Sequence, residues 1–450
     1  MRNSGRTGGA CGRAGFLMAA AGWALAAGSA SGQATQRAAF VGNNGNIEGS
    51  ITSYTFTPGG APVFVARHIT GAGSSNPGNN VYGITLTPSG EFLATTHATA
   101  LTTERITILR VNPDATLAEV GVWTTPDSPL GAAWVSDTLL AVTKTSSSGT
   151  NLVIVYRFDP AGPSLVKASE LPTTGFTSSV SVAPAGPYVY APSGGLSGPT
   201  EIAAFHVDPA GELTPIGVIG TSPYYTLGPC LNRAGTRLYG GGGISGGGGA
   251  VMAYDINPGG SLSWHPGAPF VSPGSSPSPK QCAPASDDRF MFVAHGSSSM
   301  VRSFAMDENG FLTDTGAAYD VGIQGDLGGI AVIDNLVLAT RRYSSTTYGP
   351  SGLLSFTIQP DGTFILNGPV VGSQGSQPMA IAPWSPPSAC YANCDGSTAA
   401  PILNVQDFGC FLTRYAAGDP YANCDGSTAA PVLNVQDFGC FLTKYAAGCP

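Results

Sequence analysis

The chain has 450 residues, of which only 10% are charged, and its formal net charge at pH 7 is −8. This acidic balance excludes the basic surface that nucleic acids require, so we expect no nucleic-acid partner. Glycine (63 residues) and proline (36 residues) are abundant, which suits short strands joined by tight turns and disfavours long amphipathic helices.

The N-terminus has the pattern of a secretory signal peptide. Arg2, Arg6 and Arg13 precede an apolar run over residues 16–27, and small residues follow it. A membrane anchor is the alternative, but the run is shorter than the roughly 20 residues that a spanning helix needs. We expect residues 1–30 to be removed, leaving a protein with no transmembrane segment that is extracellular, periplasmic or on the cell surface.

A unit of four short strands repeats along the chain. Residues 81–123 show it most clearly, because turn signals such as Pro88-Ser89-Gly90 separate the strands. The turn between the third and fourth strands recurs at intervals of 47 to 55 residues, beginning at Pro58, Pro113, Pro160, Pro209, Pro258, Glu308 and Pro360. Seven such units predict an all-β fold, a seven-bladed β-propeller, since one sheet cannot bury both faces alone.

The two ends of the predicted propeller belong to one blade. Residues 38–41 (AAFV) resemble a second strand, and no first strand precedes them. Residues 377–383 (QPMAIAP) match the first strand at residues 82–88 (YGITLTP). We therefore predict a propeller over residues 36–386 in which the last strand completes the first blade and removes two exposed edges.

Eight cysteines remain after the signal peptide, an even number that favours disulfides in an exported protein. Cys230 and Cys282 fall at matching positions in the first strands of adjacent blades, each seven residues before an arginine. First strands of neighbouring blades lie side by side near the axis, so a disulfide between them is geometrically allowed. Two buried free thiols are the alternative.

A proline-containing segment, residues 384–388, separates the propeller from a tail at residues 388–450. Residues 391–420 recur as 421–450 with only three changes. In each repeat we expect one helix, because Phe408, Phe411, Leu412 and Tyr415 form an apolar stripe that Gly418 ends.

So small a unit needs disulfides in addition to its core. The simplest of fifteen pairings is Cys394–Cys410, Cys424–Cys440 and Cys390–Cys449.

The predicted propeller resembles the lactonase-type seven-bladed family. The likeness lies in the blade pattern GITLTPSGEFLATTHA, followed by ERITILRVNPDATLAEVG, and it covers roughly residues 38–386. Members of that family include sugar-lactone hydrolases and cycloisomerases, as well as proteins without a known reaction. The resemblance therefore implies the fold and leaves the activity open.

The tail resembles the dockerin-type duplicated calcium loop and helix, a one-sided EF-hand. Two departures are Tyr391 and Tyr421 at the first ligand position and a loop five residues longer than usual. The alternative is a disulfide-held mini-domain in which Asp395 and Asp407 cap a turn and a helix. The resemblance implies calcium as the cofactor, with oxygen ligands from Asn393, Asp395, Asn404, Asp407, Asn423, Asp425, Asn434 and Asp437.

Candidate chemistry in the propeller lies in the loops between second and third strands, which gather at one end of the central channel. They carry Asn43, Asn44, Lys144, Tyr343 and four residues that we select as catalytic candidates: His97, His295, Arg341 and Arg342. A histidine would serve as base, and the arginines would hold a carboxylate or oxyanion. The alternative is that these are solvated loop residues.

No serine nucleophile elbow, zinc-binding helix or phosphate-binding loop is present, and the glycine-rich residues 240–249 read as a flexible hairpin loop. We therefore expect a monomeric, exported binding or surface-interaction platform, for a small molecule or a surface protein, that docks through its tail. The alternative function is a lactone hydrolase or isomerase with its site at the channel mouth.

Overall fold

The computed structural model of the chain covers the propeller and the tail with gaps. It describes residues 37–45, 49–70, 80–98, 105–125, 128–145, 150–173, 181–182, 186–193, 200–221, 225–243, 249–273, 279–296, 298–321, 327–347, 349–386, 391–395, 403–425, 427 and 431–448. The signal peptide predicted at the N-terminus lies outside these residues.

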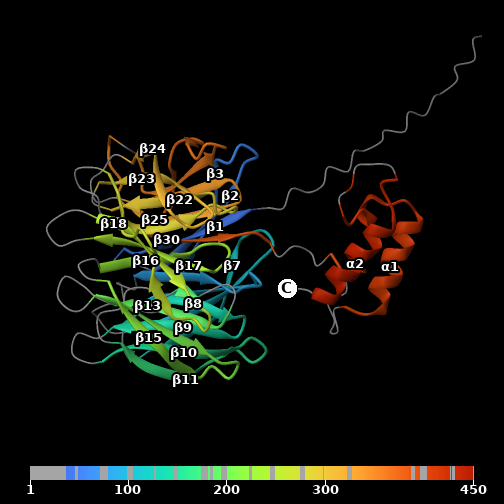
Figure 1. The fold of residues 1–450 in the computed structure, drawn as a ribbon, viewed down its shortest axis with the longest axis horizontal. Helices are drawn as coiled ribbons and strands as arrows, with labels where there is room; N and C mark the ends of the chain where they lie inside the picture. Colours follow the sequence, from blue (N-terminus) through green and yellow to red (C-terminus); the bar gives the residue numbers. More distant parts are fainter. Residues whose placement is uncertain are drawn as a thin grey trace, which may run out of the picture. The chain divides into compact units, whose positions relative to one another are not determined.

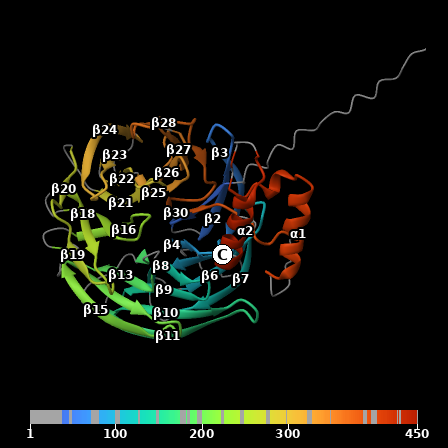
Figure 2. The same cartoon turned by 45° about the vertical axis from the view of Figure 1, so that its right-hand side comes forward.

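Seven antiparallel sheets, each built on a path of four strands, follow one another around a common axis (Figures 1 and 2). We number them as blades 1 to 7, each from its innermost to its outermost strand. Blades 1 to 3 consist of β30 (Pro378–Trp384), β1 (Ala38–Asn43), β2 (Ser50–Phe56) and β3 (Pro62–Ile69); β4 (Val81–Leu86), β5 (Phe92–His97), β6 (Arg105–Val111) and β7 (Leu117–Thr124); and β8 (Ser128–Ser136), β9 (Leu139–Thr145), β10 (Asn151–Asp159) and β11 (Ser164–Thr173).

Blades 4 to 7 repeat this order, and two of them carry one short extra strand. They consist of β12 (Ser181–Val182), β13 (Tyr188–Ser193), β14 (Glu201–Val207) and β15 (Leu213–Gly220); β16 (Tyr225–Leu231), β17 (Arg237–Gly243), β18 (Gly249–Ile256), β19 (Leu262–Trp264) and β20 (Phe270–Val271); β21 (Pro279–Pro284), β22 (Phe290–His295), β23 (Met300–Met306) and β24 (Leu312–Asp320); and β25 (Leu327–Ile333), β26 (Leu336–Arg341), β27 (Gly352–Ile358), β28 (Phe364–Leu366) and β29 (Val371–Gly372). The predicted seven-bladed architecture is confirmed.

The last strand closes the ring, as the sequence predicts. β30 pairs with β1 in antiparallel register, with Phe40 opposite Ala382. The indole Nε1 of Trp384 also donates a hydrogen bond of 2.9 Å to the carbonyl oxygen of Gly90 in blade 2. Blade 1 therefore joins residues from both ends of the propeller sequence, and its innermost strand is also tied to the following blade.

Hydroxyl groups join neighbouring blades at the turns that carry the sequence repeat. In four cases a hydroxyl donates to the carbonyl oxygen of the turn glycine of the next blade, over 2.6 to 3.0 Å: Ser169 to Gly211, Tyr190 to Gly260, Tyr239 to Gly310 and Ser355 to Gly60. All four glycines have φ between +84° and +88°, a conformation that glycine adopts without steric cost. The turn glycine thus sets the shape of the hairpin, and its carbonyl oxygen accepts the hydrogen bond that the preceding blade donates.

The glycine-rich segment is a strand for part of its length. Residues 240–243 belong to β17, so the expectation of a loop is wrong there. A Cβ atom on Gly241 would lie only 2.6 Å from the carbonyl carbon of Pro279, the first residue of β21. Glycine therefore permits the close approach of blades 5 and 6.

The tail contains two equivalent helices, α1 (Val405–Ala416) and α2 (Val435–Ala447), and a 3-10 turn, η1 (Pro420–Ala422). Their apolar stripes pack together as predicted, with the rings of Phe411 and Phe441 stacked 4.2 Å apart. Leu412, however, is 45% exposed, so its predicted place in the core is wrong. Among the described residues, neither helix has the length and apolar character that crossing a membrane requires.

Disulfide bonds cross-link both the propeller and the tail. Cys230–Cys282 joins β16 to β21, and Cys394–Cys410 and Cys424–Cys440 each tie a loop to the helix of the same repeat. These three pairings confirm the sequence predictions. Cys390 and Cys449, the third predicted pair of the tail, lie outside the described residues.

The hydroxyl ties between blades predict a measurable loss of stability. Tyr239→Phe removes the donor to Gly310 and leaves a buried carbonyl oxygen without its partner, so it should lower the free energy of unfolding by about 1–3 kcal/mol. Denaturant titration measures this change, with Tyr82→Phe, at a partly exposed tyrosine, as the control. Equal stability of the two variants would contradict the role of the tie.

Candidate functional site

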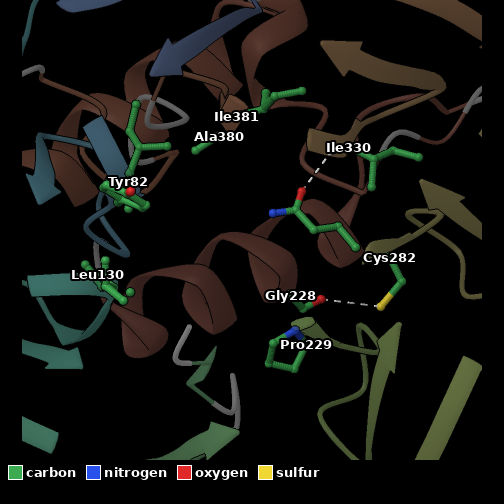
Figure 3. A pocket seen from close by; sticks show the side chains of 13 residues that line it. Tyr82, Leu130, Gly228, Pro229, Cys282, Ile330, Ala380 and Ile381 are labelled. Carbon is green, nitrogen blue, oxygen red and sulfur yellow. Dashed lines mark hydrogen bonds between the residues drawn. The ribbon is translucent and has the colours of Figure 1, made fainter. Parts of the chain in front are cut away.

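A polar cavity of about 230 Å³ occupies the axis of the propeller (Figure 3). The innermost strands of six blades supply its wall, so segments far apart in the sequence face one space. Its lining residues are Tyr82, Gly83, Ile84, Leu130, Gly131, Ala132, Gly228, Pro229, Gln281, Cys282, Ile330, Ala380 and Ile381.

The innermost strands are irregular where they line this cavity. In β4, β8, β16, β21 and β25 the pairing register shifts near the start of the strand, at a β-bulge. A bulge leaves residues unpaired and turns the local backbone. The wall of the cavity therefore presents backbone groups as well as side chains.

Threonines of the second strands fix these bulges. The hydroxyl of Thr96 accepts a 2.8 Å hydrogen bond from the amide of Gly83 and donates to the carbonyl oxygen of Leu130 in the next blade. Thr340 likewise accepts from a glycine amide of its own blade and donates over 3.1 Å to Met379 in blade 1. One hydroxyl thus couples two bulges, which makes the cavity wall continuous from blade to blade.

Two further contacts connect the cavity wall of blades 5 to 7. The disulfide Cys230–Cys282 joins blades 5 and 6 beside the cavity, because Cys282 is a lining residue. Gln281 accepts a 3.2 Å hydrogen bond at Oε1 from the amide of Ile330, so blade 6 is also tied to blade 7.

Two cations, Lys280 and Arg342, lie at the end of the propeller where second strands finish. Lys280 is the bulge residue of β21, directly before the lining residue Gln281. Its ammonium lies against Gly296, which follows the end of β22. Burial, and to a smaller extent the charge of Arg342, lowers the pKa of Lys280.

The guanidinium of Arg342 is held from two sides. Its Nη2 donates a 2.9 Å hydrogen bond to Oε1 of Gln377, and it lies 5.1 Å from the ring centre of Tyr343. Within the described part of the chain, neither Arg342 nor Lys280 forms an ion pair with an acidic side chain. Two neighbouring cations without a carboxylate favour an anionic ligand.

The predicted catalytic histidines are buried inside their blades. His97 and His295 are 0% and 1% exposed, and neither lines the axial cavity. Nε2 of His97 lies 3.3 Å from the hydroxyl of Thr107, and Nε2 of His295 lies 3.1 Å from the hydroxyl of Ser272. Burial, and then the charge of Arg302, lowers the pKa of His295 to about 4, so this histidine is neutral at pH 7.

Arg341 is also buried, and its described contact is with the preceding blade. Its Nη2 donates a 2.9 Å hydrogen bond to the carbonyl oxygen of Val321, which follows the outermost strand of blade 6. His295 makes the equivalent contact from blade 6 to Ser272 of blade 5. Both side chains therefore hold the segments that lead from one blade to the next.

The other loop candidates have similar structural contacts. Nδ2 of Asn43 donates 3.0 Å hydrogen bonds to the hydroxyls of Ser50 and Thr52. Asn44 donates over 2.9 Å to the carbonyl oxygen of Val81 in blade 2. Of the propeller loop residues singled out from the sequence, Arg342, Tyr343 and Lys144 are the ones that the structure does not bury.

Sequence reasoning missed Lys280 and the threonines. One signal for the threonines was present, because a threonine precedes a basic residue at the end of three second strands, in Thr96-His97, Thr143-Lys144 and Thr340-Arg341. Lys280 had no comparable signal. It lies on a first strand, and a bulge, which strand alternation does not reveal, sets the direction of its side chain.

The oxygen atoms predicted to bind calcium have several protein partners. Asp437 is fully buried and accepts hydrogen bonds from the amides of Asp425 and Asn434, over 3.2 and 2.8 Å. Burial raises the pKa of Asp437, but these amides outweigh burial and hold the pKa below its usual value. Asn434 in turn caps α2 through Gln436. Asp407 and Asn404 repeat this arrangement at α1.

Asn423, a predicted ligand of the second repeat, retains an unpaired oxygen. Nδ2 of Asn423 donates to the carbonyl oxygen of Ser427, while its buried Oδ1 has no hydrogen-bond partner. The described residues contain no group of three or more His, Cys, Asp or Glu side chains arranged for a metal. The helix caps account for four of the eight predicted ligands, Asn404, Asp407, Asn434 and Asp437.

Comparisons with solved structures show the same fold in other proteins. The chain is similar to a periplasmic gluconolactonase of Pseudomonas aeruginosa, with 20% identity, a TM-score of 0.61 and coverage of 78% of this chain and 100% of the other. Candidate 6-phosphogluconolactonases of Bacteroides uniformis (15% identity, TM-score 0.63, coverage 78% and 100%) and Bacteroides fragilis (16%, 0.64, 79% and 99%) are also similar. No family model matches the sequence, and no curated protein matches it.

The buried state of His295 predicts a loss of stability in acid. Its pKa is about 4 in the folded protein, below the ordinary 6.5, so between these values the unfolded chain binds a proton that the folded chain does not. The contribution of His295 to the free energy of unfolding is therefore complete above pH 6.5, and it falls by about 3 kcal/mol toward pH 4. Urea unfolding at pH 7 and pH 4.5 should show a smaller decrease for His295→Gln; an equal decrease would contradict the assignment.

Proposed function

We propose that the propeller hydrolyses lactones at the mouth of its axial cavity. The observation that carries this proposal is the pair Lys280 and Arg342, two cations without an acidic partner among the described residues. Lys280 directly precedes Gln281, which lines the polar cavity. The shared fold with a gluconolactonase adds support for this function over a binding platform.

The charges of the pair suit the electrostatic demands of the reaction. Water attacks the lactone carbonyl, negative charge develops on the carbonyl oxygen, and the ring C–O bond breaks to leave a carboxylate and a hydroxyl. Arg342, positioned by Gln377, is suited to stabilise the oxyanion and the product carboxylate. Lys280, with its lowered pKa, is suited to accept the proton of the attacking water and return it to the leaving oxygen.

Three of the four catalytic candidates take a different part in this proposal. His295 and Arg341 act as positioning residues, because they hold the segments that connect blades 5, 6 and 7. His97 occupies the equivalent strand end in blade 2 and contacts Thr107 within its own blade. Arg342 is the predicted candidate that keeps a direct role.

An exported binding platform remains the second candidate for the propeller. Its mouth would then hold an anionic small molecule or an acidic surface of a protein without chemical change. Export itself is part of both candidates, and the three described disulfides support it, because such bonds persist in oxidising compartments. We propose a monomer in either case.

For the tail we propose a calcium-binding, dockerin-like tether. The buried, unpaired Oδ1 of Asn423 is the specific observation that favours it. Calcium supplies positive charge that draws loop oxygens together. The disulfide-held mini-domain is the competing interpretation, since the caps of α1 and α2 and the two described disulfides stabilise the tail without a metal.

The lactonase proposal predicts loss of turnover at two positions. In the full chain, Arg342→Gln and Lys280→Met should each lower kcat/KM on a panel of sugar and aliphatic lactones by about 100-fold, the usual effect of removing one charge-stabilising donor. Lys167→Met, which removes an exposed lysine, is the matched control. The activity should fall with decreasing pH as Lys280 becomes protonated.

Two results would contradict the lactonase proposal. Full activity in both mouth variants would show that the site lies elsewhere. Absence of turnover across the panel, together with saturable binding of the lactones or their carboxylates that Arg342→Gln abolishes, would favour the platform.

The tether proposal predicts calcium binding that depends on Asn423. Titration calorimetry of the full chain should give a saturable heat with calcium, and Asn423→Ala should weaken the affinity by about tenfold or more. Asn112→Ala, at a turn of blade 2, removes an asparagine outside the tail and should leave the affinity unchanged. No heat with calcium would favour the disulfide-held mini-domain.

A further inference from the structure

We propose that Lys280 is a nucleophilic amine that forms an imine with small carbonyl compounds carrying an anionic group. The inference rests on the proposed function, because it uses the same binding site at Lys280 and Arg342. It concerns a covalent reaction other than lactone hydrolysis. It follows from where the amine lies, what surrounds it and how it differs from the other lysines.

Lys280 directly precedes Gln281, a residue that lines the cavity. It is the residue that the register shift of β21 leaves unpaired, between Pro279, which pairs with His295, and Gln281, which pairs with Ala294. A Cβ atom at position 296 would lie 2.5 Å from its Nζ, so glycine at this position makes room for the amine. The side chain is half-buried, which leaves it open to a small molecule.

The surroundings of Lys280 disfavour its charged form. Burial is the larger cause and Arg342 the smaller cause of its lowered pKa. His295, on the neighbouring strand β22, is neutral at pH 7, so Arg342 is the cation that acts on Lys280. A desolvated lysine beside another cation keeps a larger neutral fraction, and the neutral amine is the nucleophile.

Arg342 determines the substrate specificity of this reaction. Its guanidinium binds a carboxylate through two N–H groups. In the described part of the chain, no acidic side chain forms an ion pair with Arg342 and so competes with that ligand. A 2-oxo acid carries a carboxylate and a ketone on adjacent carbons. Such a compound would place its ketone near Lys280 while its carboxylate lies on Arg342.

Two of the other lysines, Lys167 and Lys444, lie in different environments. The chain has four lysines, Lys144, Lys167, Lys280 and Lys444. Lys167 forms a 3.0 Å ion pair with Glu170, and the ammonium of Lys444 lies 4.3 Å from the ring centre of Tyr391. Each of these two side chains therefore has a contact of its own with another residue.

The reaction balances without a further reagent. The neutral amine of Lys280 attacks the carbonyl carbon, and the resulting carbinolamine loses the former carbonyl oxygen as water. The products are one imine and one water molecule, and nothing is oxidised or reduced. Borohydride added in an experiment reduces the imine to a stable secondary amine.

Trapping with pyruvate tests the inference in the full chain. Incubation with pyruvate and sodium cyanoborohydride, followed by peptide mass spectrometry, should find the adduct on the peptide of Lys280 in preference to those of the other three lysines. Arg342→Gln should slow this labelling by about tenfold, because it removes the charge-assisted hydrogen bonds that hold the carboxylate of pyruvate beside the amine. Acetone, which has no carboxylate, should label Lys280 more slowly than pyruvate does.

The controls separate this inference from the proposed hydrolysis. Lys167→Met should leave labelling of Lys280 unchanged, and Lys280→Met should remove the adduct. Mapping of the unaltered protein locates the reactive lysine even if Lys280→Met fails to fold. Even labelling of all four lysines, or equal labelling by pyruvate and acetone, would overturn the inference whether or not lactones are hydrolysed.

Discussion

The propeller depends on hydrogen bonds that pass from one blade to the turn of the next at four of the blade junctions. A hydroxyl of one sheet meets the carbonyl oxygen of a left-handed glycine in the following sheet, at Gly60, Gly211, Gly260 and Gly310. The apolar faces between blades supply most of the burial, but they have little directional preference. The hydroxyl contacts supply direction, and they set the angle at which one blade follows another.

The axial cavity follows from the same arrangement. Six innermost strands converge there, and Thr96 and Thr340 each bind the bulge of their own blade and that of the next. This rigid wall brings backbone groups and Gln281 to one side of the cavity mouth and keeps Lys280 near Arg342. The mouth therefore combines a fixed frame with two positive charges, which is an arrangement suited to an anion.

The sequence predicts the architecture well because its signals are local. The turn glycines, the closing strand and the stripe of Phe408 and Phe411 each depend on neighbouring residues and on periodicity. The register of Cys230 and Cys282 is likewise visible in the strand pattern. These features could be predicted, and the structure confirms them.

The site is predicted less well because its geometry is not local. His97 and His295 end strands that face neighbouring blades, and only the assembled ring shows that they are buried. Lys280 reaches the mouth because of a bulge, which changes the direction of a side chain without leaving a mark in hydrophobic alternation. Leu412 fits the helical stripe by spacing, yet it lies at the exposed margin of the stripe.

The pairing of β1 with β30 constrains how the chain acquires its shape during synthesis. The first blade receives its innermost strand from residues that leave the ribosome more than 330 positions after its second strand. Until then β1 keeps an unpaired edge, and an unpaired edge invites pairing with other chains. A ring closed by its final strand therefore folds in full only after chain elongation has passed Trp384.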